Sequence, residues 1–469
     1  MESLQIIVGL GRSGVGAAKL LNSEGKKVFV IEKSKEQDCI KFKEELSELG
    51  IFVDFEKPLT LSSFKPWLGE LSSVVISPSI PWDNETLNGL RKLGIKVHGE
   101  ISLAWERLKH IPWVGITGTN GKTTVTHMLH HVLKSNKIHS DLGGNVGNSA
   151  AEIALKYKDS NQNLPKWLIM ELSSYQIESS PSISPEIGIW TTLTPDHLDR
   201  HKSLNRYASI KRSLLEKSSV PIYNADDKYL NNERNILKTG IWISANYENE
   251  NLFKEVDYCL NKEGFVIEKG KEIFHSSILS IPGIHNIRNL LMVTAAAREM
   301  GLKPYSIEKG LSSFKGVKHR LEYLGKYKSI EFFNDSKATN YDSASAGLQA
   351  INFPSIVIAG GKEKQGDPLD WLEQLNKKAY GIILYGSCAS KFKNIIKSSG
   401  FKKEIYIHKN LRKATEHAID LGLRERSITV ILSPASASFD QYKSYEERGN
   451  HFKEILMPFL TPNENNKKI

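Results

Sequence analysis

Residues 115–124, GITGTNGKTT, join an apolar run to a predicted helix through a loop rich in glycine and threonine. The usual phosphate-binding loop reads G-x-x-x-x-G-K-[ST], whereas here Ile116 stands where the first glycine should be. The shorter motif GTNGKTT, at 118–124, keeps the glycines, the lysine and the hydroxyl residue that such a loop needs. An apolar strand, a loop of this kind and a helix in succession are typical of a parallel α/β sheet, so they limit the fold class.

A second glycine turn, GLGRSG at 9–14, fits G-x-G-x-x-G. It follows the apolar run 4–8 and precedes a predicted helix at 15–24, and Glu32 follows the next apolar run at 27–31. This is the complete dinucleotide-binding fingerprint, whose glycines let the backbone approach a pyrophosphate. A UDP-sugar also carries a pyrophosphate, so NAD, a uridine nucleotide and a turn without a ligand all remain open.

Apolar strands alternate with helical stretches along the whole chain, which predicts doubly wound α/β sheets. At about 100–200 residues per domain, 469 residues suggest three domains. We place them at 1–105 (Rossmann-like), 106–315 (P-loop ATPase-like) and 316–469 (Rossmann-like). Strands are expected at 4–8, 27–31, 74–77, 95–98, 113–117, 167–170, 187–193, 240–243, 329–333, 355–359, 380–385, 404–408 and 428–432. A helix is expected at 286–300, a connector at 106–112, and a polar, irregular stretch at 224–280.

Composition narrows the class of protein. The net charge is +10, but the lysines are mixed with acids and form no basic arm, so we expect no nucleic-acid partner. No apolar run approaches the roughly 20 residues of a membrane span, and MESLQIIVGLGRSG lacks the basic leader of a signal peptide. The three cysteines, Cys39, Cys259 and Cys388, are widely spaced and form no metal or disulfide pattern, which favours the cytoplasm.

The second loop carries the chemistry of phosphate binding. Backbone N–H groups from Gly118 to Thr123 can point at phosphate oxygens, and Lys122 can reach the β- and γ-phosphates. The hydroxyl of Thr123 can ligate Mg²⁺. Glu171 ends the predicted strand 167–170 and can hold the same metal, or it is an exposed residue at a strand end. In TPDHLDRH, His197 is a candidate metal ligand, whereas Asp196 can simply cap a helix.

Several motifs, in order, resemble the Mur ligases, which are ATP-dependent amide ligases of peptidoglycan synthesis related to folylpolyglutamate synthetase. The motifs are TGTNGKTT, ELSSYQIE at 171–178, TPDHLDRH at 194–201, PGIHNIRN at 282–289, KHR at 318–320 and NDSKATN at 334–340. The resemblance extends over essentially the whole chain. The segment SPASASFDQYKSYEERGNHF, at 433–452, is similar to the branch that adds D-glutamate.

The resemblance implies a reaction. ATP would phosphorylate the terminal carboxylate of UDP-MurNAc-L-Ala, and the amine of D-glutamate would attack the acyl phosphate to give the amide, phosphate and ADP. It also implies a cytoplasmic enzyme, expected to be a monomer. The alternatives are another ligase of the same superfamily, an NAD-dependent dehydrogenase built on GLGRSG, and a regulatory nucleotide-binding protein without catalysis.

The resemblance also implies two Mg²⁺ ions. Thr123 and Glu171 would hold one, and Glu171, His197 and a carbamylated Lys211 would hold the other. Read without the resemblance, Lys211 is an ordinary surface lysine. The implied catalytic residues are Lys122, Glu171, His197 and Lys211.

The remaining implied contacts fall into three sets. The ATP-binding set is Gly118, Thr119, Asn120, Gly121, Lys122, Thr123, Thr124, Asn286, Asn289, Arg320, Asp335 and Lys337. The UDP-sugar set is Gly11, Arg12, Ser13, Glu32, Lys33, Ser77, Pro78, Ser79, Gly144, Asn145 and His197. The D-glutamate set is Thr339, Lys364, Ser438, Phe439 and Tyr445. The chain has Ser79 where the family often has glycine and Glu32 where aspartate is common, which leaves the details of uracil binding open.

Overall fold

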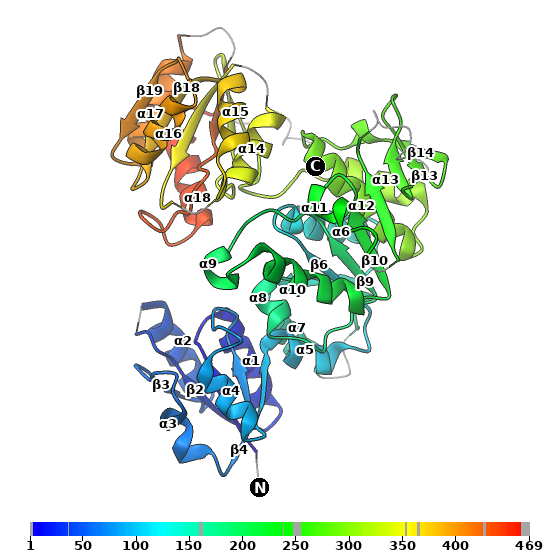
Figure 1. The fold of residues 1–469 in the computed structure, drawn as a ribbon, viewed down its shortest axis with the longest axis vertical. Helices are drawn as coiled ribbons and strands as arrows, with labels where there is room; N and C mark the ends of the chain where they lie inside the picture. Colours follow the sequence, from blue (N-terminus) through cyan, green and yellow to red (C-terminus); the bar gives the residue numbers. More distant parts are fainter. Residues whose placement is uncertain are drawn as a thin grey trace. The chain divides into compact units, whose positions relative to one another are not determined.

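The computed structural model of the chain describes residues 3–35, 37–158, 163–237, 239–246, 255–351, 354–363, 366–424 and 428–460. Within these ranges the strands form three separate sheets, and some strands of each sheet are labelled in Figure 1. Parallel pairing dominates each sheet, so the predicted α/β class is confirmed. No helix among the described residues has the length and apolar character needed to cross a membrane.

The first sheet has five parallel strands in the order β3-β2-β1-β4-β5. Its strands are β1 (Leu4–Val8), β2 (Lys27–Ile31), β3 (Phe52–Asp54), β4 (Leu71–Ile76) and β5 (Lys96–Gly99). Its helices are α1 (Arg12–Ser23), α2 (Gln37–Glu48), α3 (Leu61–Phe64), α4 (Glu85–Lys92) and α5 (Glu100–Leu108). The central strand β1 is buried on both faces, which is why it reads as a nearly continuous apolar run.

The second sheet has nine strands in the order β14-β13-β12-β11-β10-β9-β6-β8-β7. The strands from β7 to β12 pair in parallel, whereas β12, β13 and β14 pair antiparallel at one edge. The strands are β6 (Trp113–Thr117), β7 (Ser140–Gly144), β8 (Trp167–Glu171), β9 (Ile187–Trp190), β10 (Val220–Asn224), β11 (Ile241–Ser244), β12 (Tyr258–Leu260), β13 (Phe265–Glu268) and β14 (Lys271–His275). The helices are α6 (Lys122–Ser135), α7 (Ala150–Lys156), α8 (Ser174–Glu178), α9 (Leu198–His201), α10 (Leu204–Lys217), α11 (Lys228–Asn232), α12 (Ile284–Glu299) and α13 (Pro304–Ser312).

The third sheet has six strands in the order β15-β16-β20-β17-β18-β19, with only the edge strand β15 antiparallel. The strands are β15 (Glu322–Tyr327), β16 (Ile330–Asn334), β17 (Ser355–Gly360), β18 (Ala379–Tyr385), β19 (Ile405–His408) and β20 (Ile428–Leu432). The helices are α14 (Tyr341–Ala350), α15 (Leu369–Lys378), α16 (Ala389–Ser398), α17 (Leu411–Gly422) and α18 (Tyr445–Leu456).

By its internal contacts the chain divides into two compact units. The first unit holds residues Met1–Leu193, Asp199–Ser276 and Leu290–Leu311, and the second holds Thr194–Leu198, Ser277–Asn289 and Ser312–Ile469. The first two sheets share a unit because α1 packs against α7 and buried side chains of both sheets join one apolar cluster. The predicted boundaries at 105 and 315 stay predictions.

Most predicted strands are confirmed within a few residues, but three expectations were wrong. The expected connector 106–112 begins inside helix α5, which continues to Leu108. The strand expected at 187–193 ends at Trp190, after which the backbone of Thr191 and Thr192 serves the phosphate loop. The stretch 224–280 is more regular than expected, because the antiparallel strands β12, β13 and β14 follow β11, which itself confirms the strand expected at 240–243.

A buried carboxyl group joins the segments of the first and second sheets. Glu100, in the first turn of α5, is 2% exposed, and its carboxylate accepts the N–H of Ala151 at the start of α7 at 2.5 Å. The positive end of a helix favours an anion there. Burial nevertheless dominates and raises the pKa of Glu100 to about 7, although Arg12 opposes the shift.

We expect Glu100→Gln to stabilise the first unit at neutral pH. In the native protein the carboxyl group keeps its proton up to about pH 7, whereas in the unfolded chain it ionises near 4.5. Its contribution to stability is therefore present below pH 4.5 and is lost as the pH rises through 7, by up to about 3 kcal/mol. The midpoints of urea unfolding at pH 5 and pH 8, which should differ in the wild type, should converge in the variant. Glu70→Gln, at an exposed carboxylate, is the control. A pH dependence identical to that of the wild type would contradict this account.

Candidate active site

The phosphate loop lies between β6 and α6 and is held by the end of β9. The N–H groups of Thr119 and Asn120 donate to the carbonyl and hydroxyl oxygens of Thr192, at 2.9 Å and 3.0 Å. Thr191 is fully buried and its hydroxyl donates to the carbonyl oxygens of Thr117 and Asn120. Two of the predicted phosphate-binding amides are therefore engaged by Thr192, which follows β9. The first turn of α6, whose N–H groups have no intrahelical acceptor by geometry, is the best anion site of the loop.

Two lysines converge on one carbonyl oxygen of this loop. Lys122 donates from Nζ to the carbonyl oxygens of Gly118 and Thr119, both at 2.9 Å. Lys211, on α10, donates from Nζ to the same oxygen of Gly118 at 2.9 Å. Lys211 is only 1% exposed and lies 4.4 Å from the ring centroid of Tyr207, so it is not the surface lysine that its local sequence suggests.

Glu171 connects the phosphate loop to the first glycine turn. It ends β8 beside β6, with Ile116 opposite it in register, and is 1% exposed, which excludes the reading of an exposed strand-end residue. Asn145 donates from its amide side chain to Glu171 Oε1 at 2.8 Å, and Arg12 donates to the carbonyl oxygen of Asn145 at 3.4 Å. Residues predicted for the metal and for the UDP-sugar therefore lie together at one edge of the first unit.

The residues at this edge fit Mg²⁺. Thr123, at the start of α6, and Glu171, at the end of β8, offer a hydroxyl and a carboxylate, and Mg²⁺ prefers such oxygen ligands together with water and phosphate oxygens. Gly121, at φ +86°, lets the loop turn into α6. Among the described residues, no group of three or more His, Cys, Asp or Glu side chains could hold a metal by itself. The protein oxygens would have to be completed by those of a nucleotide.

His197 belongs to the second unit, so its approach to Glu171 and Lys211 stays a prediction. It adopts a left-handed backbone conformation with φ +56°, and its Nε2 lies 3.6 Å from the Asp196 carboxylate. Asp196 accepts a hydrogen bond from the Asn340 amide at 3.4 Å and one from the N–H of His197 at 2.9 Å. Asp196 therefore ties the segment of His197 to the start of α14.

The residues predicted to bind the nucleoside of ATP lie in the second unit. Asn286 and Asn289 are both buried in the first turns of α12, and the amide of Asn289 donates to Asn286 Oδ1 at 3.2 Å. Asp335 accepts the N–H of Leu321 at 3.1 Å and the hydroxyl of Ser433 at 3.3 Å. Burial raises the pKa of Asp335 to about 7, and the neighbouring Arg320 opposes that shift.

The predicted D-glutamate residues are only partly brought together. Ser438 is buried and begins a turn, whereas Phe439 is 67% exposed. The Nζ atom of Lys337 lies 3.7 Å from the ring centroid of Tyr445, at the start of α18, so a residue predicted for ATP meets one predicted for D-glutamate. Thr339 lies two residues further along the same loop, and Lys364 lies outside the described residues.

The first glycine turn is closed by the carboxylate predicted to bind the uridine nucleotide. Glu32 accepts the N–H of Leu10 at 2.5 Å and that of Ser34 at 2.8 Å, so it also holds the loops after β1 and β2 together. Ser77 and Ser79 face each other with their hydroxyl oxygens 3.3 Å apart. These contacts do not test whether Glu32 binds uracil, so that role stays a prediction.

Two groups of residues around the site were not predicted from the sequence. Thr191 and Thr192 hold the phosphate loop, and the signal available was two hydroxyl residues near the end of the strand expected at 187–193. Glu178, Arg200 and Arg206 form a network of ion pairs, and nothing in their spacing indicated it.

Comparisons with known proteins define the class. A model of the Mur ligase middle domain matches residues 116–297. The fold is that of UDP-N-acetylmuramate-alanine ligase MurC from Thermotoga maritima, at TM-score 0.59 and 19% identity over 97% of this chain and 99% of that one. MurF from Acinetobacter baumannii is similar at TM-score 0.59 and 18% identity, over 92% of this chain and 91% of that one.

Sequence relatives define the branch. Proteins named UDP-N-acetylmuramoylalanine–D-glutamate ligase from two strains of Prochlorococcus marinus are 54% and 50% identical to this chain. The alignments cover 97% of this chain in both cases, and 96% and 99% of the relatives. The chain belongs to the Mur ligases, within the family of UDP-N-acetylmuramoylalanine–D-glutamate ligases.

Proposed function

We propose that this chain joins D-glutamate to UDP-N-acetylmuramoyl-L-alanine at the expense of ATP, a step in the synthesis of peptidoglycan precursors. The observation that supports it most is the identity of 54% over 97% of the chain to a ligase named for this reaction. The edge at which Asn145 meets Glu171 beside the phosphate loop agrees with a site where a UDP-sugar carboxylate reaches ATP.

The reaction proceeds in two balanced steps. The terminal carboxylate of the UDP-sugar attacks the γ-phosphorus of ATP and releases ADP, which gives an acyl phosphate. The amine of D-glutamate then attacks the acyl carbon, and phosphate leaves as the amide forms with loss of a proton. Both substrates are anions, so cationic groups must lower their repulsion.

Residues of the phosphate loop supply groups that lower this repulsion. Lys122 exchanges the carbonyl oxygens of Gly118 and Thr119 for phosphate oxygens, and the first turn of α6 donates its amides to them. Thr123 and Glu171 would hold Mg²⁺, which would offset phosphate charge when bound. Asp335 and the two asparagines of α12 bind the nucleoside.

Lys211 carries a carbamate in this proposal. The Lys211 ammonium group loses one proton, and the neutral amine then combines with CO₂ and loses a second proton. A cation thereby becomes an anion with two oxygens, which would help His197 and Glu171 hold a second Mg²⁺. The carbamate nitrogen retains one N–H, so the hydrogen bond to the carbonyl oxygen of Gly118 can persist. The enzyme is further proposed to act as a monomer in the cytoplasm.

The test is phosphate release with ATP, Mg²⁺ and UDP-N-acetylmuramoyl-L-alanine. D-glutamate, L-glutamate, L-alanine and meso-diaminopimelate are supplied in parallel. We expect release with D-glutamate alone, because the C-terminal segment matches the branch that adds it. Release only with another amino acid would refute the substrate assignment and keep the ATP chemistry, whereas no release with any of them would refute the ligase.

A further inference from the structure

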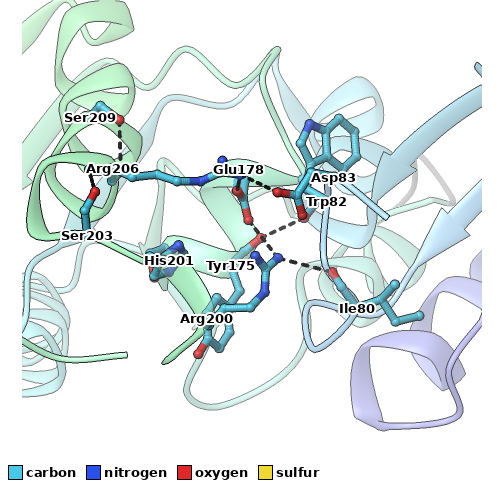
Figure 2. Close-up of polar contacts among 12 residues, drawn as sticks. Ile80, Trp82, Asp83, Tyr175, Glu178, Arg200, His201, Ser203, Arg206 and Ser209 are labelled. Atoms are coloured by element: carbon cyan, nitrogen blue, oxygen red, sulfur yellow. Dashed lines mark hydrogen bonds and ion pairs between the residues drawn. The ribbon is translucent and has the colours of Figure 1, made fainter. Parts of the chain in front are cut away.

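Besides Glu100, a second buried carboxylate, that of Glu178, takes part in the contact between the segments of the first and second sheets. It ends α8 and its side chain is 7% exposed. Its Oε2 accepts a hydrogen bond from Arg200 Nη2 at 2.8 Å, and its Oε1 accepts one from Arg206 Nη2 at 3.0 Å. Figure 2 shows both guanidinium groups beside the same carboxylate, one from α9 and one from α10.

Each of these arginines also reaches the segment of the first sheet. Arg200 Nη2 lies 3.5 Å from the carbonyl oxygen of Ile80, and Arg206 Nη2 lies 3.1 Å from Asp83 Oδ2 (Figure 2). Arg200 is 13% exposed in its side chain and lies 5.5 Å from the ring centroid of Tyr175. The hydrogen bond to Glu178 raises the pKa of Arg206, so the guanidinium stays charged at any working pH.

The loop they reach, residues 77–83, is fixed on its other side within the first sheet. The N–H of Ser77 donates to the carbonyl oxygen of Val8 at 2.8 Å, and that of Ile80 donates to the carbonyl oxygen of Ser77 at 3.0 Å. Arg91 lies over the ring of Trp82 at 3.9 Å from its centroid and donates to the carbonyl oxygen of Trp82 at 3.0 Å. The loop is therefore held between β1 and α4 on one side and the arginines on the other.

Together, Glu178, Arg200 and Arg206 form what we call the clamp. Two of the helices that carry them lie close in sequence to residues assigned to the reaction. α8 begins three residues after Glu171, and Arg206 lies five residues before Lys211 on α10. The loop itself carries Ser77, Pro78 and Ser79, which are assigned to the UDP-sugar. A buried carboxylate that binds two arginines has few alternative arrangements, because loss of one partner leaves a charge desolvated.

We propose that Glu178, Arg200 and Arg206 are positioning residues for the UDP-sugar, which hold the 77–83 loop at the distance from the second sheet that this substrate requires. The proposal rests on the ligase function above and adds to it residues that are assigned to neither ATP nor D-glutamate. The affinity for the UDP-sugar therefore depends on this clamp, whereas the affinity for the nucleotide does not.

The test compares equilibrium binding of UDP-N-acetylmuramoyl-L-alanine and of a non-hydrolysable ATP analogue to the full chain. We expect Arg200→Ala to raise the Kd for the UDP-sugar about tenfold or more and to leave that of the nucleotide within about twofold. Arg200→Lys keeps the charge but has a single ammonium group in place of the guanidinium fork, so it should recover part of the affinity. In the ligase assay, Arg200→Ala should likewise raise the KM for the UDP-sugar and leave the KM for ATP nearly unchanged.

Two further variants keep the test decisive if Arg200→Ala fails to fold. Asp83→Asn removes an exposed carboxylate, so it should fold and should raise the Kd for the UDP-sugar severalfold, less so at high salt because exposed pairs are screened. Arg298→Ala removes a comparable ion pair to Glu268, at 2.7 Å, that lies within the second-sheet segment, and should change neither Kd.

The outcomes separate this proposal from the ligase function. Wild-type protein that does not bind the UDP-sugar would overturn both. Wild-type binding with unchanged affinity in Arg200→Ala and Asp83→Asn would overturn the clamp alone. Equal weakening of UDP-sugar and nucleotide would also overturn it, because that result describes general damage to the first unit.

Discussion

Replacing Lys211 by alanine is expected to lower the rate of amide formation at least about a thousandfold, the size of effect that follows loss of a group stabilising charge in the transition state. Lys211 is 1% exposed and its Nζ lies 2.9 Å from the carbonyl oxygen of Gly118, inside the phosphate loop. If the side chain acts as a carbamate, formate or acetate should enter the vacated space and restore part of the rate. Initial rates with and without these acids are the measurement.

Two companion variants separate chemistry from folding. Lys211→Met keeps most of the buried volume and should be equally inactive, with a melting temperature closer to that of the wild type. Lys217→Ala removes an exposed lysine from the same helix and should retain full activity. Growth of a ¹³C carbamate signal with labelled bicarbonate in the wild type, absent from Lys211→Met, would identify the modified residue. Full, bicarbonate-independent activity of Lys211→Ala would refute the carbamate.

Strands with an apolar run in the sequence could be predicted, whereas the buried strand β10, whose run is interrupted by Pro221, was missed. β6 and β20 read as continuous apolar runs, and their bounds were predicted without error. β3 was missed because it is a three-residue edge strand whose Phe52 is 60% exposed, so it has no apolar run. β12, β13 and β14 were missed because they are short and because β13 and β14 are only partly buried. These strands are held side by side by antiparallel pairing and carry no apolar run that the sequence could reveal.

The features of the site could likewise be predicted where their cause is local, but not where they depend on packing between distant parts of the chain. The glycines of the phosphate loop could be predicted because backbone conformation is a local demand. The burial of Lys211 could not, because the face of α10 that is covered depends on packing against β9 and α8, which no helical spacing reveals. The same holds for Thr192, whose bonds to the loop come from more than seventy residues along the chain.

Gly118→Ala is the second large effect, and we expect it to lower ATP affinity at least about tenfold and the ligase rate by more than a hundredfold. A Cβ atom at Gly118 would collide with the hydroxyl of Thr191 and lie 3.0 Å from the amide nitrogen of Thr192. Both residues hold the phosphate loop, and Thr192 does so through its backbone, which cannot move aside. The φ of +144° adds strain of roughly 1–3 kcal/mol for any side chain.

Gly301→Ala is the matched control, because it also has a positive φ, +85°, but nothing lies within 4 Å of its added Cβ. It should lose about 1 kcal/mol of stability and keep nucleotide affinity. Equilibrium binding of an ATP analogue to both variants, with their melting temperatures, measures the difference. If Gly118→Ala bound the nucleotide like the wild type, the loop would have to tolerate displacement of Thr192. If both variants lost affinity equally, backbone strain alone would account for the loss, and the close approach of Thr191 and Thr192 would have no part in holding the phosphate site.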